Sequence, residues 1–257
     1  MIGFDSFAVV DWSGGNDPGP RPRADAIWVA VVRAGEASAP QYLRNRGLAE
    51  AFLANLIEEE RVAGRRLAIG FDFPFGYPSG FAERVAGREE ALHLWDWLEA
   101  HVEGASSTHN RFELAAELNA MFPGTGPFWS NGLKRDIPGL PRKDTRDGHG
   151  MLERRQAEKD TKGAFPVWQL AGAGAVGSQT RMGLPVLARL RRRFEGQISV
   201  WPFEPLTTQV AFIEVWPSLV TPVVRAAMSE DSIKDAEQVR LLAGAMARLA
   251  PERLQAM

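Results

Sequence analysis

The sequence predicts an α/β fold built around a mixed β-sheet. Short apolar segments with strand character alternate with amphipathic helical segments along the 257 residues. A helical segment also separates three early strands from a fourth that is apolar throughout, as is typical of a buried parallel strand. The composition agrees, because 45% hydrophobic and 24% charged residues are ordinary values for a globular protein.

The first part of the predicted sheet is a three-strand antiparallel meander. Short turns join these strands, and a Pro/Gly-rich turn at 17–20 separates the first two. A helix then carries the chain to the fourth strand, which can lie parallel to the first. The expected strands are 7–11, 26–33, 41–44 and 67–73, and the expected helix is 48–62.

A large insertion follows the fourth strand, at 76–164, within a predicted single domain of residues 1–257. It combines helical segments with a long stretch rich in glycine, proline and charge, and a loop of that length is usually functional or mobile. The sheet is then completed by further strands and flanking helices. Expected helices lie at 89–102, 112–121, 184–194 and 232–249, an extended piece at 165–170, and strands at 198–204 and 210–217.

The absence of cysteine excludes several classes of site. With no Cys, the chain cannot form disulfides, zinc–thiolate sites, iron–sulfur clusters or a cysteine nucleophile. The first residues have no basic region before a long apolar run, and no window approaches the ~20 apolar residues of a membrane span. We therefore expect a cytoplasmic protein with no membrane partner.

Charge is distributed unevenly along the chain. Residues 131–195 hold 14 Lys/Arg and 7 Asp/Glu, whereas the remainder holds 16 and 25. A basic block in an acidic protein favours either a phosphate-rich partner or a solvated surface of ion pairs. The first interpretation predicts a nucleic acid or nucleotide partner.

Carboxylates end or interrupt apolar strands at several places. Asp11 closes "FAVVD" and Asp72 lies in "LAIGFDF", and adjacent parallel strands would bring both to one sheet edge. Glu214 and Glu204 interrupt later apolar strands, and either could be a fourth acid. Asp231 and Asp235 are four residues apart, so both can share a face at the start of the last helix.

Four converging carboxylates would repel one another unless a cation lies between them. Oxygen ligands without cysteine or a histidine pair favour Mg²⁺ or Mn²⁺. A pair of such ions can activate water and stabilise the leaving oxygen in phosphodiester cleavage. Each acid taken alone has an equally good structural role, as a turn cap, an ion-pair partner or a first-turn helix acid.

Four segments, in order, resemble a family of uncharacterised prokaryotic proteins predicted to be RNase H-like nucleases. They are "VVDWSGG", "LAIGFDFPFGYP", "IEVWPSL" and "DSIKDAEQVRLLAGAMARL". The resemblance covers residues 5–78 and 195–250 and implies an RNase H-like mixed sheet. It implies catalytic, metal-holding roles for Asp11, Asp72, Glu214 and Asp235. Glu204, as the other possible fourth acid, and Asp231, from its spacing to Asp235, are further metal candidates.

Phosphate contacts are expected from the basic block and from polar residues beside turns. Lysine and arginine recognise phosphate by charge, and hydroxyl and amide groups add hydrogen bonds. The candidates are Ser13, Arg142, Lys143, Arg154, Lys159, Gln179 and Arg181.

A glycine-rich turn at 172–178, "GAGAVGS", supports an alternative function. It matches G-x-G-x-x-G but lacks the P-loop lysine, and the segment before it makes a poor strand. The alternative is a nucleotide-binding protein without hydrolysis, for example one linked to molybdopterin-guanine dinucleotide synthesis, as labels of some members of that family imply. A third interpretation is a scaffold whose basic insertion docks a protein.

Overall fold

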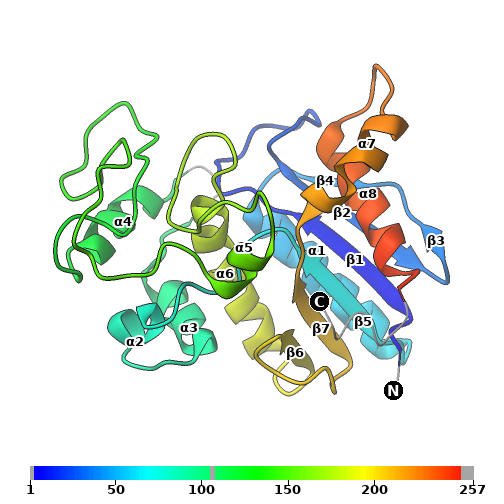
Figure 1. The fold of residues 1–257 in the computed structure, drawn as a ribbon. Coiled ribbons are helices and arrows are strands. Elements are labelled where there is room, and N and C mark those ends of the chain that lie inside the picture. The colour runs from blue at the N-terminus through cyan, green and yellow to red at the C-terminus, as the bar shows by residue number, and fades with distance from the viewer. Residues whose placement is uncertain (1–2, 105–107, 250–257) are drawn as a thin grey trace. The chain divides into compact units, whose positions relative to one another are not determined.

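The structure, a computed structural model, describes residues 3–104 and 108–249 and divides the chain into two compact units. The first unit contains residues 1–72 and 190–257, and the second contains residues 73–189. Figure 1 shows their elements as a ribbon. The second unit therefore contains the expected insertion at 76–164 and continues through the glycine-rich turn. No helix in the described part of the chain combines the length and apolar character needed to cross a membrane.

The first unit is built on a seven-stranded mixed sheet, which confirms the α/β class. Its strands follow the order β3-β2-β1-β5-β7-β6, and β4 also pairs with β2. The pairs of β2 with β1, β3 and β4 are antiparallel, whereas β1, β5, β7 and β6 are mutually parallel. The strands are β1 (Ser6–Asp11), β2 (Ile27–Arg33), β3 (Glu36–Ala37), β4 (Gln41–Leu43), β5 (Leu67–Phe71), β6 (Ile198–Trp201) and β7 (Val210–Glu214).

Helices on opposite faces cover this sheet. Alternate residues of β1 point to opposite faces, and Phe7 and Val9 belong to an apolar core with residues of α8. Ser6 points to the other face, where its hydroxyl donates to Glu60 of α1 at 2.7 Å. Residues of β2 and β5 that pair with a residue of β1 point to the same face of the sheet as that residue. The helical elements of this unit are α1 (Arg46–Val62), η1 (Pro217–Val220), α7 (Thr221–Ala227) and α8 (Lys234–Met246).

Three strands end earlier than the apolar pattern predicts. Strands were expected to reach residues 73, 204 and 217, but β5, β6 and β7 end at Phe71, Trp201 and Glu214. A proline lies just beyond each end, and proline lacks the N–H that a ladder needs. Helix α1 begins two residues earlier than expected because the Asn45 side chain accepts a hydrogen bond from the Leu48 amide at 3.0 Å.

The second unit is helical and irregular around an aromatic core. Tyr77, Phe81, Phe128 and Trp168 lie with ring centroids 4.4–5.8 Å apart. The buried Asn119 amide fixes the irregular segment by donating to the Phe128 and Gly139 carbonyls and accepting from the Phe128 amide. Its helices are α2 (Phe81–Ala86), α3 (Ala91–His101), α4 (Arg111–Asn119), α5 (Gln156–Asp160) and most of α6 (Gly177–Arg193).

Two expectations for the second unit are corrected. Helix α6 begins seven residues before the expected start at 184, and it contains Pro185. The piece at 165–170, expected to be extended, instead contains a turn in which the Gln169 amide donates to the Pro166 carbonyl at 3.4 Å. A central strand was already disfavoured there by Pro166.

A buried carboxylate joins α1 to the sheet. Glu60 is fully buried and accepts hydrogen bonds from Ser6, Arg33 and Arg65 at 2.6–2.7 Å. Burial alone would raise its pKa, but these hydrogen bonds outweigh burial and hold the pKa of Glu60 at about 2, below its ordinary 4.5. The ionised carboxylate therefore stabilises the fold above pH 4.5, and this stability is lost as the pH falls toward 2.

We expect Glu60→Gln to lower the free energy of unfolding at neutral pH by about 2 kcal/mol. The difference from the wild type should shrink as the pH falls below 4.5, where the native carboxylate begins to lose its advantage. Urea unfolding at a series of pH values measures both effects. Glu58→Gln is the matched control, because Glu58 pairs with Arg61 on the surface of the same helix and should change little. An equal loss at low and neutral pH would contradict the prediction.

Candidate active site

Two aspartates lie side by side at the carboxyl ends of neighbouring parallel strands. Asp11 is the last residue of β1, and Asp72 directly follows β5. The register pairs Val10 with Phe71, and the Asp72 amide donates to the Val10 carbonyl at 3.2 Å, so Asp72 continues the pairing. Because residues alternate between faces, both aspartates face α8. The sequence-based expectation that they meet at one edge is met by this geometry.

Hydrogen bonds orient both carboxyl groups. The Trp12 amide donates to Asp72 Oδ1 at 2.7 Å, and Gln238 Nε2 of α8 donates to Asp11 Oδ2 at 3.3 Å. Each carboxyl therefore accepts a hydrogen bond from a neutral donor, and the two carboxyls act on each other electrostatically.

Electrostatics at the pair strongly favour protonation. Burial, followed by the charges of Asp72 and Asp235, raises the pKa of Asp11 well above 3.8, while Lys234 opposes the shift. Burial, with a smaller contribution from the charge of Asp235, raises the pKa of Asp72 to about 7, against the hydrogen bond from the Trp12 amide. Within the described residues neither carboxylate forms an ion pair with an arginine or lysine. When both groups are ionised, no ion pair therefore offsets their repulsion.

Asp235 belongs to the same acidic group, whereas Asp231 does not share its helix. Asp235 lies in the first turn of α8, where the helix dipole favours an acid, and its charge acts on both strand aspartates. Its Oδ2 accepts a hydrogen bond from the Asp25 amide at 2.8 Å. Asp231 lies in the turn before α8 and is exposed, so the expectation of one shared helix face is wrong.

The two candidate glutamates lie apart from the aspartate pair. Glu214 is paired with Phe71, so it occupies the sheet face opposite to Asp11 and Asp72. Glu204 follows β6 in a turn and is not part of a strand, contrary to expectation. Its oxygens accept from Arg191 at 2.7 Å and from the Val200 amide at 2.9 Å. The structure thus gathers Asp11, Asp72 and Asp235 and leaves both glutamates outside that group.

The carboxylate oxygens of the aspartate pair are suitable ligands for a hard divalent cation. Carboxylate oxygens are the ligands that Mg²⁺ and Mn²⁺ prefer, and a dication would relieve the repulsion between Asp11 and Asp72. Among the described residues, no three aspartate, glutamate or histidine side chains are already arranged as a ligand group. Asp11 and Asp72 are therefore the two residues best placed to hold a metal. Asp235 is the further acid whose charge acts on both of them.

Ser13 contributes to the same neighbourhood through the loop after β1. Its hydroxyl donates to the Asp25 carbonyl at 3.1 Å and accepts from the Gly15 amide at 3.1 Å. Asp25 in turn donates its amide to Asp235. Ser13 thus shapes the loop beside the aspartates, and its expected phosphate contact stays a prediction.

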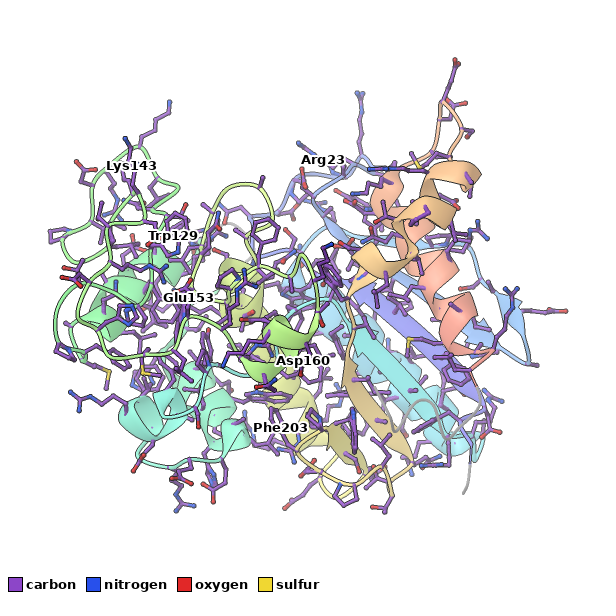
Figure 2. All side chains as sticks on the ribbon, in the orientation of Figure 1. Arg23, Trp129, Lys143, Glu153, Asp160 and Phe203 are labelled. Carbon is purple, nitrogen blue, oxygen red and sulfur yellow. The ribbon has the colours of Figure 1, made fainter. Side chains whose placement is uncertain are left out.

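The basic phosphate candidates all belong to the second unit, and several support its own backbone. Arg142 binds Asp136 and the carbonyls of Leu133 and Lys134, and Arg154 donates to the Ala164 carbonyl at 2.6 Å. Lys143, labelled in Figure 2, is exposed on the irregular segment. Of the remaining candidates, Lys159 is exposed, Gln179 is half-buried and Arg181 is fully buried.

Arg181 is enclosed by aromatic rings. Its guanidinium lies 4.2 Å from the Phe128 ring centroid, and Nη1 donates to the Arg111 carbonyl at 2.5 Å. Burial lowers the pKa of Arg181, although the neighbouring Tyr77 opposes this. A buried guanidinium in this position supports the aromatic core and does not present itself to a phosphate in solution.

The glycine-rich turn is explained by close packing. A Cβ at Gly174 would lie 2.3 Å from the Phe165 ring, and one at Gly177 would lie 2.4 Å from the Val167 carbonyl oxygen. The Gly177 amide donates a hydrogen bond to the Gln169 carbonyl at 3.0 Å. Close packing at Gly174 and Gly177, together with the positive φ of Gly172 and Gly174, accounts for the glycines of this turn.

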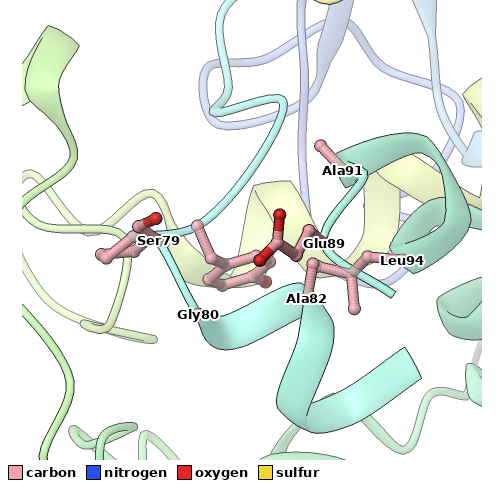
Figure 3. A pocket seen from close by; sticks show the side chains of 8 residues that line it. Ser79, Gly80, Ala82, Glu89, Ala91 and Leu94 are labelled. Atoms are coloured by element: carbon pink, nitrogen blue, oxygen red, sulfur yellow. The ribbon is translucent and has the colours of Figure 1, made fainter. Parts of the chain in front are cut away.

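A cavity of about 230 Å³ lies in the second unit, between the turn after Tyr77 and the start of α3 (Figure 3). The Ser79 hydroxyl and the Glu89 carboxylate are polar groups on its wall, and Ala82 and Leu94 are among its apolar residues. None of the residues expected to bind metal or phosphate lines it. The cavity therefore does not bear on the aspartate pair.

Two contacts at the site are not evident from sequence motifs. Gln238 could have been found, because it lies three residues after Asp235 and so shares its helix face. The Trp12 amide carries no side-chain signal, since every residue except proline offers the same backbone donor. The sequence therefore identified the acids but not the groups that orient them.

We expect Asp72→Asn to stabilise the metal-free protein at neutral pH. A folded pKa of about 7 against 3.8 means that the native state binds the proton more tightly, so stability falls as the pH rises from 3.8 to 7. The amide keeps an acceptor for Trp12 and removes the charge. The gain should be on the order of 2 kcal/mol above pH 7 and absent near pH 4, by urea unfolding in EDTA. A loss of stability at pH 7 would contradict this.

No family model, no curated protein and no solved structure matches the chain. The comparisons therefore assign neither a family nor an activity. The evidence for function lies in the chain's own residues, above all in the aspartate pair at the ends of β1 and β5.

Proposed function

We propose that the protein is a divalent-metal-dependent phosphodiester hydrolase with an RNase H-like fold, acting on nucleic acid or a nucleotide. The fold assignment is supported by the sheet of the first unit. A central β1 has the antiparallel β2 on one side and the parallel β5 on the other. Acids end β1, follow β5 and open the last helix, as the sequence resemblance implies.

One observation carries the functional proposal: the uncompensated pair Asp11 and Asp72. Two buried carboxylates that form no ion pair among the described residues are costly to a fold unless they serve a function. Elsewhere in the same unit, the buried Glu60 is offset by two arginines. The absence of such an offset at the described contacts of Asp11 and Asp72 favours a site that receives its positive charge from a bound ion.

In this proposal Asp11 and Asp72 hold Mg²⁺ or Mn²⁺, and Asp235 is the third acid. The bound metal would supply activation of water and stabilisation of the leaving oxygen. The chain's own groups provide the orientation. Trp12 fixes one oxygen of Asp72 through its amide, Gln238 contacts Asp11, and Asp235 adds negative charge that favours a dication.

We expect Asp11→Asn and Asp72→Asn each to lower Mn²⁺-dependent cleavage of single-stranded or branched oligonucleotides by about 100-fold or more. Neither change alters the size of the side chain, so the fold should persist in circular dichroism. Calorimetric titration with Mn²⁺ should lose its heat of binding in the double variant. Glu214→Gln is the matched control, because it removes an acid from the opposite sheet face and should leave cleavage within about threefold.

Three outcomes would count against this proposal. Activity that survives Asp72→Asn, or is abolished by Glu214→Gln, would remove the assignment of the metal ligands. Equilibrium binding of GTP or NAD without turnover, unaffected by Asp72→Asn, would favour the nucleotide-binding alternative that uses the turn at 172–178. No heat of Mn²⁺ binding in the wild type would favour the scaffold.

A further inference from the structure

The loop between β1 and β2 is tightly anchored despite its length and irregularity. Tyr42 donates its hydroxyl to the Gly19 carbonyl at 2.7 Å, and Arg44 forms an ion pair with Asp17 at 2.9 Å. Arg46 donates to the Gly15 carbonyl at 2.5 Å. These bonds come from β4, the short link after it and the start of α1, so the first half of the loop is held by one segment of the chain.

The second half of the same loop is fastened beside the acidic group. Asp25 donates its amide to Asp235 and accepts at its carbonyl from Ser13, and its φ of 57° is the left-handed conformation. The Trp28 indole donates to the Arg23 carbonyl at 3.0 Å. The backbone of Arg23 is thus fixed two residues from a group that contacts Asp235.

This loop carries two arginines that the fold does not use. Arg21 and Arg23 are exposed, and among the described residues their guanidinium groups make no hydrogen bond or ion pair. By contrast, the guanidinium of Arg44 forms an ion pair with Asp17 of the same loop. Figure 2 labels Arg23, which lies at the end of the first unit where α8 begins.

A third cation borders the acids from the helix side. Lys234 is the first residue of α8, it is exposed, and its charge acts directly on Asp11. A lysine at a helix N-terminus is unfavourable toward the helix dipole. Its position is therefore not explained by helix stability.

We propose that Arg21, Arg23 and Lys234 form a cationic rim that binds the phosphates of a nucleic-acid strand on either side of the phosphodiester held at Asp11 and Asp72. This inference rests on the proposed function and assigns its substrate class. Phosphates are bound well by exposed arginine and lysine, and a pre-anchored backbone reduces the ordering that binding requires. Arg21 and Arg23 are at most about 7 Å apart along the backbone, a spacing comparable to that of successive phosphates along a strand.

The test measures binding of a fluorescein-labelled single-stranded oligonucleotide by fluorescence anisotropy, with the full chain in EDTA and at several salt concentrations. We expect the double variant Arg21→Ala with Arg23→Ala to weaken binding about 10-fold and to lower the salt dependence, the slope of log K against log salt, by about 2 units. Lys234→Ala should lower that slope by about 1 unit. Arg248→Ala is the matched control, because Arg248 is an exposed arginine beyond the opposite end of α8 and should leave the slope unchanged.

The outcomes separate this inference from the proposed function. Oligonucleotide binding that depends on Arg21 and Arg23 without any Mn²⁺-dependent cleavage would support the rim and count against hydrolysis. Cleavage by the wild type, with the arginine variants binding and cleaving normally, would overturn the rim alone. Wild-type protein that does not bind the oligonucleotide, or binds only GTP with the same arginine dependence, would overturn the assignment of a strand substrate.

Discussion

The parallel pairing of β1 with β5 is the constraint on which the candidate site depends. It aligns Val10 with Phe71, and the next residue on each strand is an aspartate. Because side chains alternate along a strand, a slip of one residue would send Asp72 to the opposite face, away from Asp11. The apolar residues that fill the two faces of the sheet fix this register, so core packing and the position of the acids are set by the same contacts.

The two faces of this sheet treat buried carboxylates in opposite ways. On the α1 face, Glu60 receives hydrogen bonds from Arg33, Arg65 and Ser6, and its ionised form strengthens the fold. On the α8 face, Asp11 and Asp72 are buried beside each other, form no ion pair among the described residues, and have pKa values raised first of all by burial. The arrangement around Glu60 is the one that stability favours. The arrangement of Asp11 and Asp72 is typical of a binding or catalytic site.

Much of the sheet was predictable because apolar runs and turn residues are local signals. The first strands, the parallel fourth strand and the meeting of Asp11 with Asp72 followed from them. The face occupied by Glu214 was not predictable, because it depends on the register between β5 and β7, which no motif encodes. The ion pair between Glu204 and Arg191 was not predictable either, because it depends on where α6 and β6 end. The RNase H-like assignment itself remains a proposal.

The hydrogen bond from Trp12 to Asp72 has a consequence for how the site can vary. Since the donor belongs to the main chain, nineteen of the twenty amino acids at position 12 would supply it equally, and proline alone would withdraw it. The orientation of Asp72 therefore does not depend on which side chain occupies position 12. The buried indole of Trp12, which is 1% exposed, can therefore be exchanged for another side chain without removing this hydrogen bond.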